Sequence, residues 1–183
     1  MDILNIVATA VTTKPFDLNK LQRALKGSEK ATSGANWLKM RLPETGKYVA
    51  FYKSGKFLIT GVKSLIELDS IVNNVRTMLS NCDIEVLIKE VKIHNVVVSD
   101  NINIRCSLEK IILNNNNIFA YYEPERFPGM VIHGDDCTYL LFSSGRVICL
   151  GNESIEIAKK NVEWIKRYIG AVDDGNKKNY GNM

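Results

Sequence analysis

A chain of 183 residues is long enough to bury a hydrophobic core, as one domain or as two small ones. Hydrophobic residues make up 45% and charged residues 24%, which is typical of globular proteins, and no apolar run approaches the roughly 18 residues of a membrane span. The four cysteines lack CxxC spacing, so neither a zinc site nor a disulfide framework is indicated, and reduced thiols in an intracellular protein are expected.

The net charge of +4 is unevenly distributed. Residues 1–88 contain 12 lysines and arginines against 8 acidic residues, whereas residues 89–171 contain 10 of each. The positive excess therefore lies in the first half of the chain, where it weakly favours a polyanionic partner.

The chain is predicted to begin with a strand and an amphipathic helix, and to repeat this pair later. Residues 3–10 read as a short apolar strand, and leucines at helical spacing predict a helix over 17–26 with Asp17 as its N-cap. The later copies are a strand at 91–99 and a helix at 107–113.

A hairpin and a long helix are predicted to follow in each half. Residues 47–61 alternate with period two around a Ser54-Gly55 turn, where glycine can supply a positive φ. Apolar stripes at helical spacing predict the long helices at 64–79 and 154–169. Both faces of the hairpin are apolar: helices can cover one, and the other needs a partner. One face carries Val49, Phe51, Phe57 and Ile59, and the other carries Ala50, Tyr52, Leu58 and Thr60.

Three segments have weaker signals. Residues 81–89 are expected to lead, partly as an edge strand, into the second half. The asparagine run at 114–117 is predicted to be a polar loop, and residues 172–183 a disordered tail.

The two halves are related by a constant step of 90 residues, which indicates an internal duplication. Trp37 precedes Phe127 by this step, and Tyr52 precedes Phe142. The same step links Ser54-Gly55-Lys56 to Ser144-Gly145-Arg146, Gly61 to Gly151, and Asn5 to Asn95.

The most specific motifs of this repeat are YEPERFPG at 122–129, FSSGRV at 142–147, KSGKFLITG at 53–61, and Asn-x-Val at residues 5–7 and 95–97. Through these motifs the chain resembles the C-terminal core of the TATA-box-binding proteins, a family of general transcription initiation factors. The resemblance covers nearly all of residues 2–171.

The resemblance implies an α+β fold: a saddle of two pseudo-symmetric repeats, residues 1–88 and 89–171, that share one curved antiparallel sheet with helices on its convex face. It also implies a function without catalysis or cofactor, in which the concave face enters the minor groove of A·T-rich promoter DNA and bends it. Minor-groove wedging and kinking by this family is a general example of architectural DNA binding.

The resemblance and the residue types together suggest the contacts. Asn5, Asn95 and Thr60 would donate to base acceptors, because A·T pairs show only acceptors in the minor groove. Apolar strand residues would pack where no guanine amino group intrudes. The predicted DNA-contact set is Asn5, Val7, Trp37, Tyr52, Leu58, Thr60, Asn95, Val97, Phe127, Leu140, Phe142, Ile148 and Leu150.

Two pairs of rings are predicted to wedge between bases. Phe127 and Phe142 match the family's pair. In the first repeat, an ungapped comparison with the family puts Ala35 at the first wedge position, whereas the 90-residue step puts Trp37 there. Trp37 is preferred because it lies 15 residues before Tyr52, as Phe127 does before Phe142, which suggests hairpins of equal length. Taken singly, each ring would more often be a core aromatic.

The predicted phosphate contacts are Arg41, Lys47, Lys56 and Arg146, which would position the protein without reading sequence. Glu123 and Glu125 are either solvated loop charges or, as in the family, a docking site for a transcription factor IIB-like protein. No membrane or small-molecule partner is expected. The expected location is intracellular: the nucleus, an archaeal cytoplasm or a viral replication site.

A rival interpretation keeps the fold but not the DNA binding. Asp135 and Asp136 would repel nearby phosphates, Leu150 stands where the first repeat has Thr60, and the first-repeat wedge differs from the family's. On these grounds the chain would be a protein-interaction module with weak or lost DNA binding.

Overall fold

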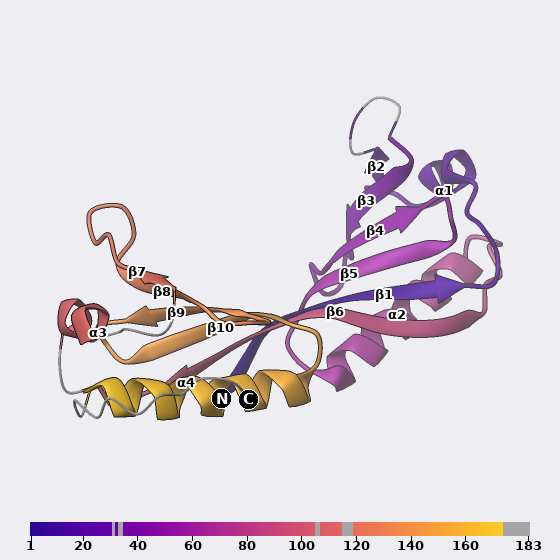
Figure 1. Ribbon diagram of the computed structural model, residues 1–183. Coiled ribbons are helices and arrows are strands. Elements are labelled where there is room, and N and C mark those ends of the chain that lie inside the picture. Colours follow the sequence, from indigo (N-terminus) through magenta and orange to yellow (C-terminus); the bar gives the residue numbers. More distant parts are fainter. Residues whose placement is uncertain (31, 33–34, 105–106, 115–118, 174–183) are drawn as a thin grey trace. The chain divides into compact units, whose positions relative to one another are not determined.

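The structure, a computed structural model, describes residues 1–30, 32, 35–104, 107–114 and 119–173 (Figure 1). Over these residues it contains four helices and ten strands. The helices are α1 (Leu18–Ala24), α2 (Leu65–Ser80), α3 (Leu108–Asn114) and α4 (Ile155–Asp173). The strands are β1 (Asp2–Thr12), β2 (Glu29–Lys30), β3 (Trp37–Arg41), β4 (Tyr48–Tyr52), β5 (Lys56–Val62), β6 (Ile88–Asn101), β7 (Ala120–Tyr121), β8 (Gly129–His133), β9 (Thr138–Phe142) and β10 (Arg146–Asn152).

The chain forms two compact units, and β6 runs from the first into the second. The N-terminal unit comprises residues 4–94, and the C-terminal unit comprises residues 1–3 and 95–183. Strand order is β2-β3-β4-β5-β1-β6 in the N-terminal unit and β6-β10-β9-β8-β7 in the C-terminal unit. Among the described residues, no helix combines the length and the hydrophobicity that a membrane span requires.

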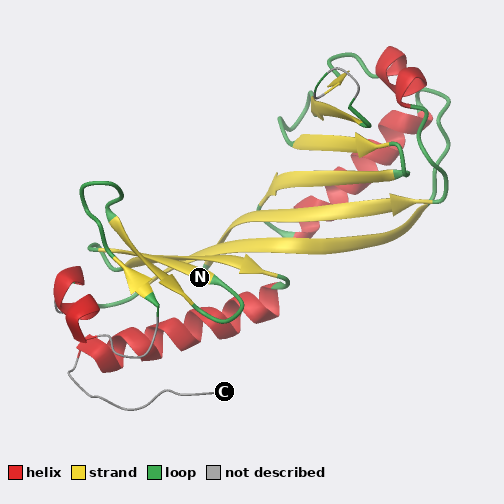
Figure 2. Cartoon of the chain, turned by 45° about the horizontal axis from the view of Figure 1, so that its top comes forward, coloured by secondary structure: helices red, strands yellow, loops and turns green. Residues whose placement is uncertain are grey.

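In the N-terminal unit, period-two alternation separates a buried strand face from an open one. Phe51, Phe57 and Ile59 are fully buried, whereas Leu58 and Thr60 are half-buried. Helix α2 lies on the buried side of the strands (Figure 2), and its stripe of Leu68, Ile71, Val72, Val75 and Leu79 is buried. The predicted assignment of the two hairpin faces is confirmed.

The C-terminal unit repeats this arrangement with α4 as its long helix (Figure 1). Tyr139, Leu141 and Val147 point to the buried side, while Leu140 and Ile148 alternate with them on the open side. Helix α4 buries Ala158, Val162, Ile165 and Ile169. An apolar strand face covered by an apolar helix stripe therefore forms the core of each unit.

The predicted helices and the Asp17 cap are present. Asp17 Oδ1 accepts hydrogen bonds from the backbone N–H groups of Asn19 and Lys20, which satisfies two donors at the start of α1. Those hydrogen bonds hold the pKa of the Asp17 carboxyl below its usual value.

Other details of the sequence-based prediction were wrong or incomplete. Of residues 81–89, predicted to lead partly as an edge strand into the second half, only Ile88 and Lys89 are in a strand; that strand is β6, which lies between β1 and β10 and is not an edge. The outer strands β2, β3, β7 and β8 were not predicted; of these, β3 and β8 form hairpins with the next strands in the chain, β4 and β9. Of the predicted polar loop, Asn114 ends α3 and residues 115–117 lie outside the described residues, as do residues 174–183 of the predicted tail; α4 includes residues 172 and 173.

Candidate nucleic-acid interface

The open strand faces contain every residue of the predicted DNA-contact set except Phe127, which lies in the loop before β8. These side chains are half-buried, in contrast to the buried residues that alternate with them. The N-terminal unit contributes Asn5 and Val7 from β1, Trp37 from β3, Tyr52 from β4, and Leu58 and Thr60 from β5. The C-terminal unit contributes Asn95 and Val97 from β6, Leu140 and Phe142 from β9, and Ile148 and Leu150 from β10.

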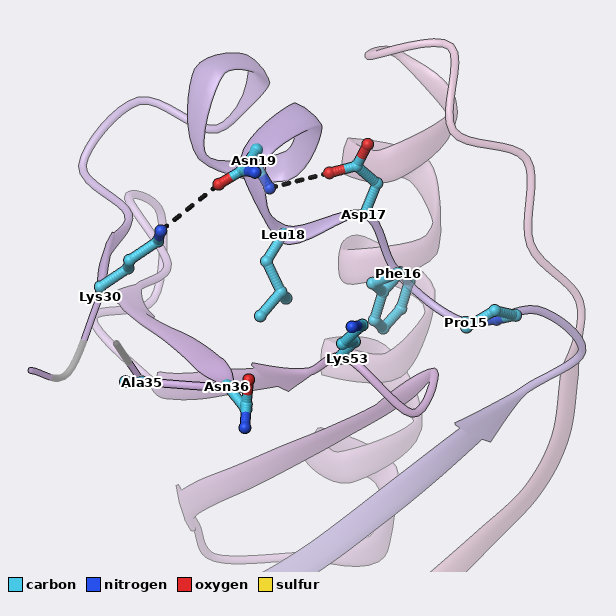
Figure 3. Close-up of a pocket in the computed structure, with 9 residues that line it drawn as sticks. All are labelled: Pro15, Phe16, Asp17, Leu18, Asn19, Lys30, Ala35, Asn36 and Lys53. Carbon is cyan, nitrogen blue, oxygen red and sulfur yellow. Dashed lines mark hydrogen bonds between the residues drawn. The ribbon is translucent and has the colours of Figure 1, made fainter. Parts of the chain in front are cut away.

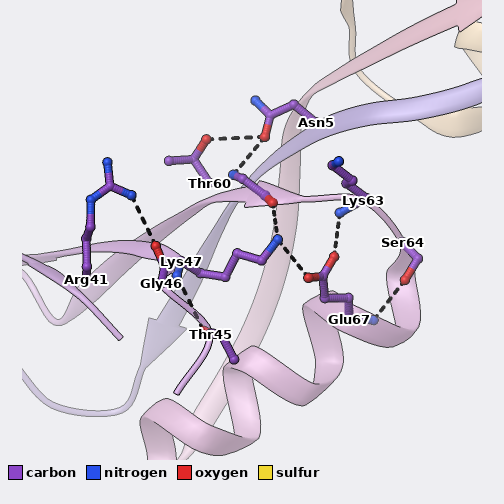
Figure 4. Close-up of polar contacts among 10 residues, drawn as sticks. Asn5, Arg41, Thr45, Gly46, Lys47, Thr60, Lys63, Ser64 and Glu67 are labelled. Carbon is purple, nitrogen blue, oxygen red and sulfur yellow. Dashed lines mark hydrogen bonds and ion pairs between the residues drawn. The ribbon is translucent and has the colours of Figure 1, made fainter. Parts of the chain in front are cut away.

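A β-bulge in the N-terminal unit fixes the orientation of the Asn5 amide. The pairing of β1 with β5 shifts between Ile6 and Ala8, and Gly61 on β5 has a φ of 90°, which favours glycine. The Gly61 N–H donates to Asn5 Oδ1 at 2.7 Å, and the Thr60 hydroxyl lies 3.4 Å from the same oxygen (Figure 4). Because an N–H can only donate, the atom facing it must be the oxygen, and the NH₂ group of Asn5 therefore points away from the bulge.

The C-terminal unit has the same arrangement of a bulge glycine and an asparagine. Its β10–β6 pairing shifts between Cys149 and Asn152, Gly151 has a φ of 95°, and the Gly151 N–H donates to Asn95 Oδ1 at 3.1 Å. Each unit thus presents one amide NH₂ among the apolar side chains of its open face. A donor in such a position can meet the acceptors N3 of adenine and O2 of thymine.

Each unit also brings two aromatic rings together at the end of its open face. Trp37 and Tyr52 stack with centroids 6.0 Å apart and planes inclined by 24°. Phe127 and Phe142 meet edge to face, with centroids 5.8 Å apart and planes inclined by 65°. The structure therefore forms both predicted pairs, in two different geometries.

The geometries differ because the two hairpins differ in length. Tyr52 pairs with Trp37, whereas its equivalent Phe142 pairs with Gly129, two residues beyond Phe127. The reason is that six residues separate β3 from β4 and only four separate β8 from β9. The prediction of equal hairpins was wrong: by strand register, Ala35 is the counterpart of Phe127.

A pocket of about 620 Å³ opens beside Ala35 (Figure 3). Leu18 points into it from α1, and Lys30, Asn36 and Lys53 line its other sides. A methyl group at position 35 cannot fill the volume that a phenylalanine ring fills. This end of the N-terminal unit is therefore more polar and more open than a wedge of two phenylalanines.

Three of the four predicted phosphate contacts are exposed and belong to the open-face register. Arg41 lies on β3 four residues after Trp37, so its side chain is on the same face of the strand. Its Nη1 donates to the carbonyl of Gly46 at 3.1 Å. Lys56 begins β5 and Arg146 begins β10, each two residues before an apolar open-face residue.

Lys47 is placed on the other side of the sheet. Its Nζ lies 2.8 Å from Glu67 Oε1 on α2 and donates to the carbonyl of Gly61 (Figure 4). The Lys47 side chain and the Lys63 N–H both donate to Glu67 and hold its pKa below the usual value. Lys47 thus links the bulge to α2, and we retain only Arg41, Lys56 and Arg146 as candidate phosphate contacts.

The two glutamates predicted to dock a partner lie in the exposed turn between β7 and β8. The carbonyl of Glu123 accepts from the N–H groups of Arg126 and Phe127, which closes the turn. Glu123 Oε2 also lies 3.0 Å from Arg126 Nη1. Arg126 therefore partly neutralises one of the two carboxylates, whereas Glu125 is exposed.

The sequence analysis missed one group of open-face residues. Phe119, Tyr121 and His133 form a cluster at the outer strands of the C-terminal unit. Alternation of Phe119 with Tyr121, and of Gly129, Val131 and His133, is the period-two signal from which it was detectable.

Taken separately, each unit has a helix-covered antiparallel sheet with a bulge-oriented asparagine, apolar strand residues and a ring pair on its open face. The protein is therefore a duplicated α+β protein with one such face per repeat. The family model described as "Transcription factor TFIID (or TATA-binding protein, TBP)" matches the chain twice, over residues 1–82 and 90–171.

Individual relatives agree with this match. The TATA-box-binding protein of Methanothermobacter thermautotrophicus is 34% identical, over 93% of this chain and 95% of that protein. The TATA-box-binding protein of Archaeoglobus fulgidus is also 34% identical, over 91% and 93% respectively. Among solved structures, Methanococcus jannaschii TBP aligns with a TM-score of 0.84 at 30% identity, covering 92% of this chain and 97% of that one.

The chain belongs to the TATA-binding protein family. This confirms the resemblance drawn from the sequence and the predicted α+β fold with an antiparallel sheet.

Proposed function

We propose that the protein is a general transcription initiation factor that binds and bends A·T-rich promoter DNA through the minor groove. The observation that carries the proposal is the amide orientation repeated in both units: Asn5 and Asn95 each turn an NH₂ donor outward because a bulge glycine holds the oxygen. The names of the relatives and of the family support the same role.

The open faces suit the chemistry of A·T pairs. Their apolar side chains pack against a groove floor that has no exocyclic amine, and a guanine N2 amino group would both collide with them and lose its hydrogen bonds to water. Two outward amides supply donors where A·T pairs have acceptors. Discrimination between A·T and G·C therefore needs few polar groups.

Bending is assigned to the ring pairs. Inserting rings between base pairs costs about a few kcal/mol per unstacked step. The bent DNA contacts a larger protein surface, and these added contacts offset the cost. Phe127 and Phe142 form the apolar pair, whereas the Tyr52 hydroxyl needs a hydrogen-bonding partner when buried. We expect a sharper kink at the Phe127–Phe142 end.

The proposal includes a protein partner. Family membership implies a transcription factor IIB-like protein, and the exposed turn that carries Glu123 and Glu125 suits a basic surface on it. Because the matched relatives are archaeal, the proposed place of action is the cytoplasm.

The second candidate function is a protein-interaction module with weak DNA binding. The open, lysine-lined pocket beside Ala35 favours it, because one apolar wedge of the usual pair is missing there.

Inosine substitution separates these functions. Inosine·cytosine pairs keep the minor-groove pattern of A·T pairs and change the major-groove pattern. Affinity for an inosine-substituted duplex should stay within a few-fold of the A·T duplex, while G·C pairs should abolish specific binding. Equal damage from inosine·cytosine and G·C pairs would exclude minor-groove reading. No measurable binding to any A·T-rich duplex at low salt would favour the interaction module.

A further inference from the structure

An exposed aromatic cluster at the outer strands of the C-terminal unit has no role in the function proposed above. We call it the β7–β8 patch, and it consists of Phe119, Tyr121 and His133. The ring of His133 lies 5.4 Å from that of Phe119 and 6.0 Å from that of Tyr121, and the two carbocyclic rings are 6.4 Å apart. Phe119 is 72% exposed and Tyr121 44% exposed, so the patch is open to a ligand.

The β7–β8 patch continues the open face. Tyr121 pairs with Val131, and His133 pairs with Thr138 on β9. Thr138 alternates with Leu140 and Phe142 along the same side of β9. Any duplex that lies on those residues has its backbone beside the outer strands.

Strand register assigns His133 a counterpart in the N-terminal unit. Thr138 is the equivalent of Tyr48, 90 residues earlier, because the β9–β10 and β4–β5 pairings agree at that step. Tyr48 pairs with Arg41, and Thr138 pairs with His133. His133 therefore occupies the position at which the N-terminal unit has an exposed arginine on its open face.

We propose that the β7–β8 patch is a second DNA-backbone contact, in which the rings of Phe119 and Tyr121 pack on deoxyribose and the imidazole of His133 binds a phosphate. This inference rests on the proposed function and adds a site to it. Thr138 Oγ1 lies 3.4 Å from His133 Nδ1, which leaves Nε2 as the atom that reaches outward to the phosphate.

Two carboxylates border the proposed phosphate contact. Asp135 and Asp136 follow His133 in the β8–β9 turn, whereas β7 adds the phenol of Tyr121 and β9 adds the neutral Thr138. Because carboxylates repel a phosphate, the contact needs a hydrogen-bond donor that reaches past them. The Nε2 atom of His133 supplies that donor, since Nδ1 is engaged by Thr138.

The experiment compares the wild type with His133→Ala and His133→Arg on one A·T-rich duplex, with affinity measured by fluorescence anisotropy at several salt concentrations. His133→Ala should weaken binding about tenfold, because the charge-assisted hydrogen bond to the phosphate is lost. His133→Arg should restore the affinity. It should also steepen the slope of log affinity against log salt by about 0.9 relative to His133→Ala, because arginine adds one charged phosphate contact.

The matched control is Arg41→Ala, the same truncation at the counterpart position, which should lower affinity and make the salt slope shallower by about 0.9. The double variant Phe119→Ala/Tyr121→Ala tests the rings, and it should weaken binding without changing the salt slope. Thermal melting of each variant shows whether it is folded.

The outcomes separate this inference from the proposed function. If His133→Ala binds DNA as tightly as the wild type while Arg41→Ala binds more weakly, the inference is wrong and the function stands. The same holds if the double variant binds DNA as the wild type does. If the wild type itself binds no A·T-rich duplex, both are overturned.

Discussion

Replacing Gly129 with alanine should disable the Phe127–Phe142 ring pair while leaving the protein folded. A Cβ at position 129 would lie 2.7 Å from Phe127 Cε1 and 3.1 Å from Phe142 Cε1. Carbon atoms in contact are normally about 3.5–4.0 Å apart, so the Phe127 ring must move by about 1 Å. Gly129 has no positive φ, and alanine can therefore adopt the backbone; only the rings are disturbed.

The cost to folding should be small. Overpacking a closed core costs about 1–3 kcal/mol, but Phe127 is 37% exposed and precedes the strand, so it can turn outward. The lower entropy of an unfolded chain with alanine offsets about 0.4–1 kcal/mol. We expect the free energy of unfolding to change by less than about 1 kcal/mol.

The effect on DNA should be larger. A displaced ring no longer enters the unstacked step with its partner, and the loss of an aromatic pair and its burial is worth about 1–2 kcal/mol, or about five- to thirtyfold in affinity. Urea unfolding, anisotropy binding and the bend angle of a duplex labelled for energy transfer at both ends would measure the three quantities.

Gly170→Ala is the matched control. A Cβ at Gly170 in α4 meets nothing within 4 Å, so the substitution should stabilise the helix by about 0.5–1 kcal/mol and leave DNA binding unchanged. If Gly129→Ala binds and bends DNA as the wild type does, the ring pair is not the wedge.

Three further predictions follow from the open faces and the core. Phe142→Ala should weaken DNA binding more than Tyr52→Ala on the same duplex, because only tyrosine must desolvate a hydroxyl; equal losses would contradict the assignment. Asn95→Asp keeps the oxygen that accepts from the bulge N–H but exchanges the NH₂ donor for a carboxylate oxygen, so affinity should fall at least a hundredfold while the melting temperature stays within a few degrees. Asp100 lies 3.0 Å from Lys166, and although burial opposes it, hydrogen bonding lowers its pKa below the usual value. A lowered carboxyl pKa stabilises the fold above about pH 4, and this stabilisation is lost as pH falls through the lowered value. Asp100→Asn should therefore cost about 1 kcal/mol in urea unfolding at pH 7, and this cost should shrink as Asp100 becomes protonated in acid; a cost independent of pH would show that the charge is not responsible.

The sequence by itself determined the duplication, the hairpin faces, the helices and the family. These features depend on local order: alternation with period two separates two strand faces, spacing near 3.6 marks a helix stripe, and Asp17 caps a helix through atoms two and three residues away. The YEPERFPG motif and its neighbours were specific enough to identify the family before any contact was known. Asn5 and Asn95 were detectable because they recur at the repeat interval.

Only the tertiary structure decided the register of the outer strands and what depends on it. Two extra residues in the β3–β4 turn shift the pairing by two, and this alone makes Ala35 the counterpart of Phe127 and Arg41 the counterpart of His133. Lys47 likewise looks like any strand-end lysine until α2 brings Glu67 to 2.8 Å from it. Strand pairing and ion pairing join residues that lie far apart in the chain. Trp37 and Tyr52 are as far apart in the sequence as Phe127 and Phe142, so the constant spacing could not reveal that the β3–β4 turn is the longer one.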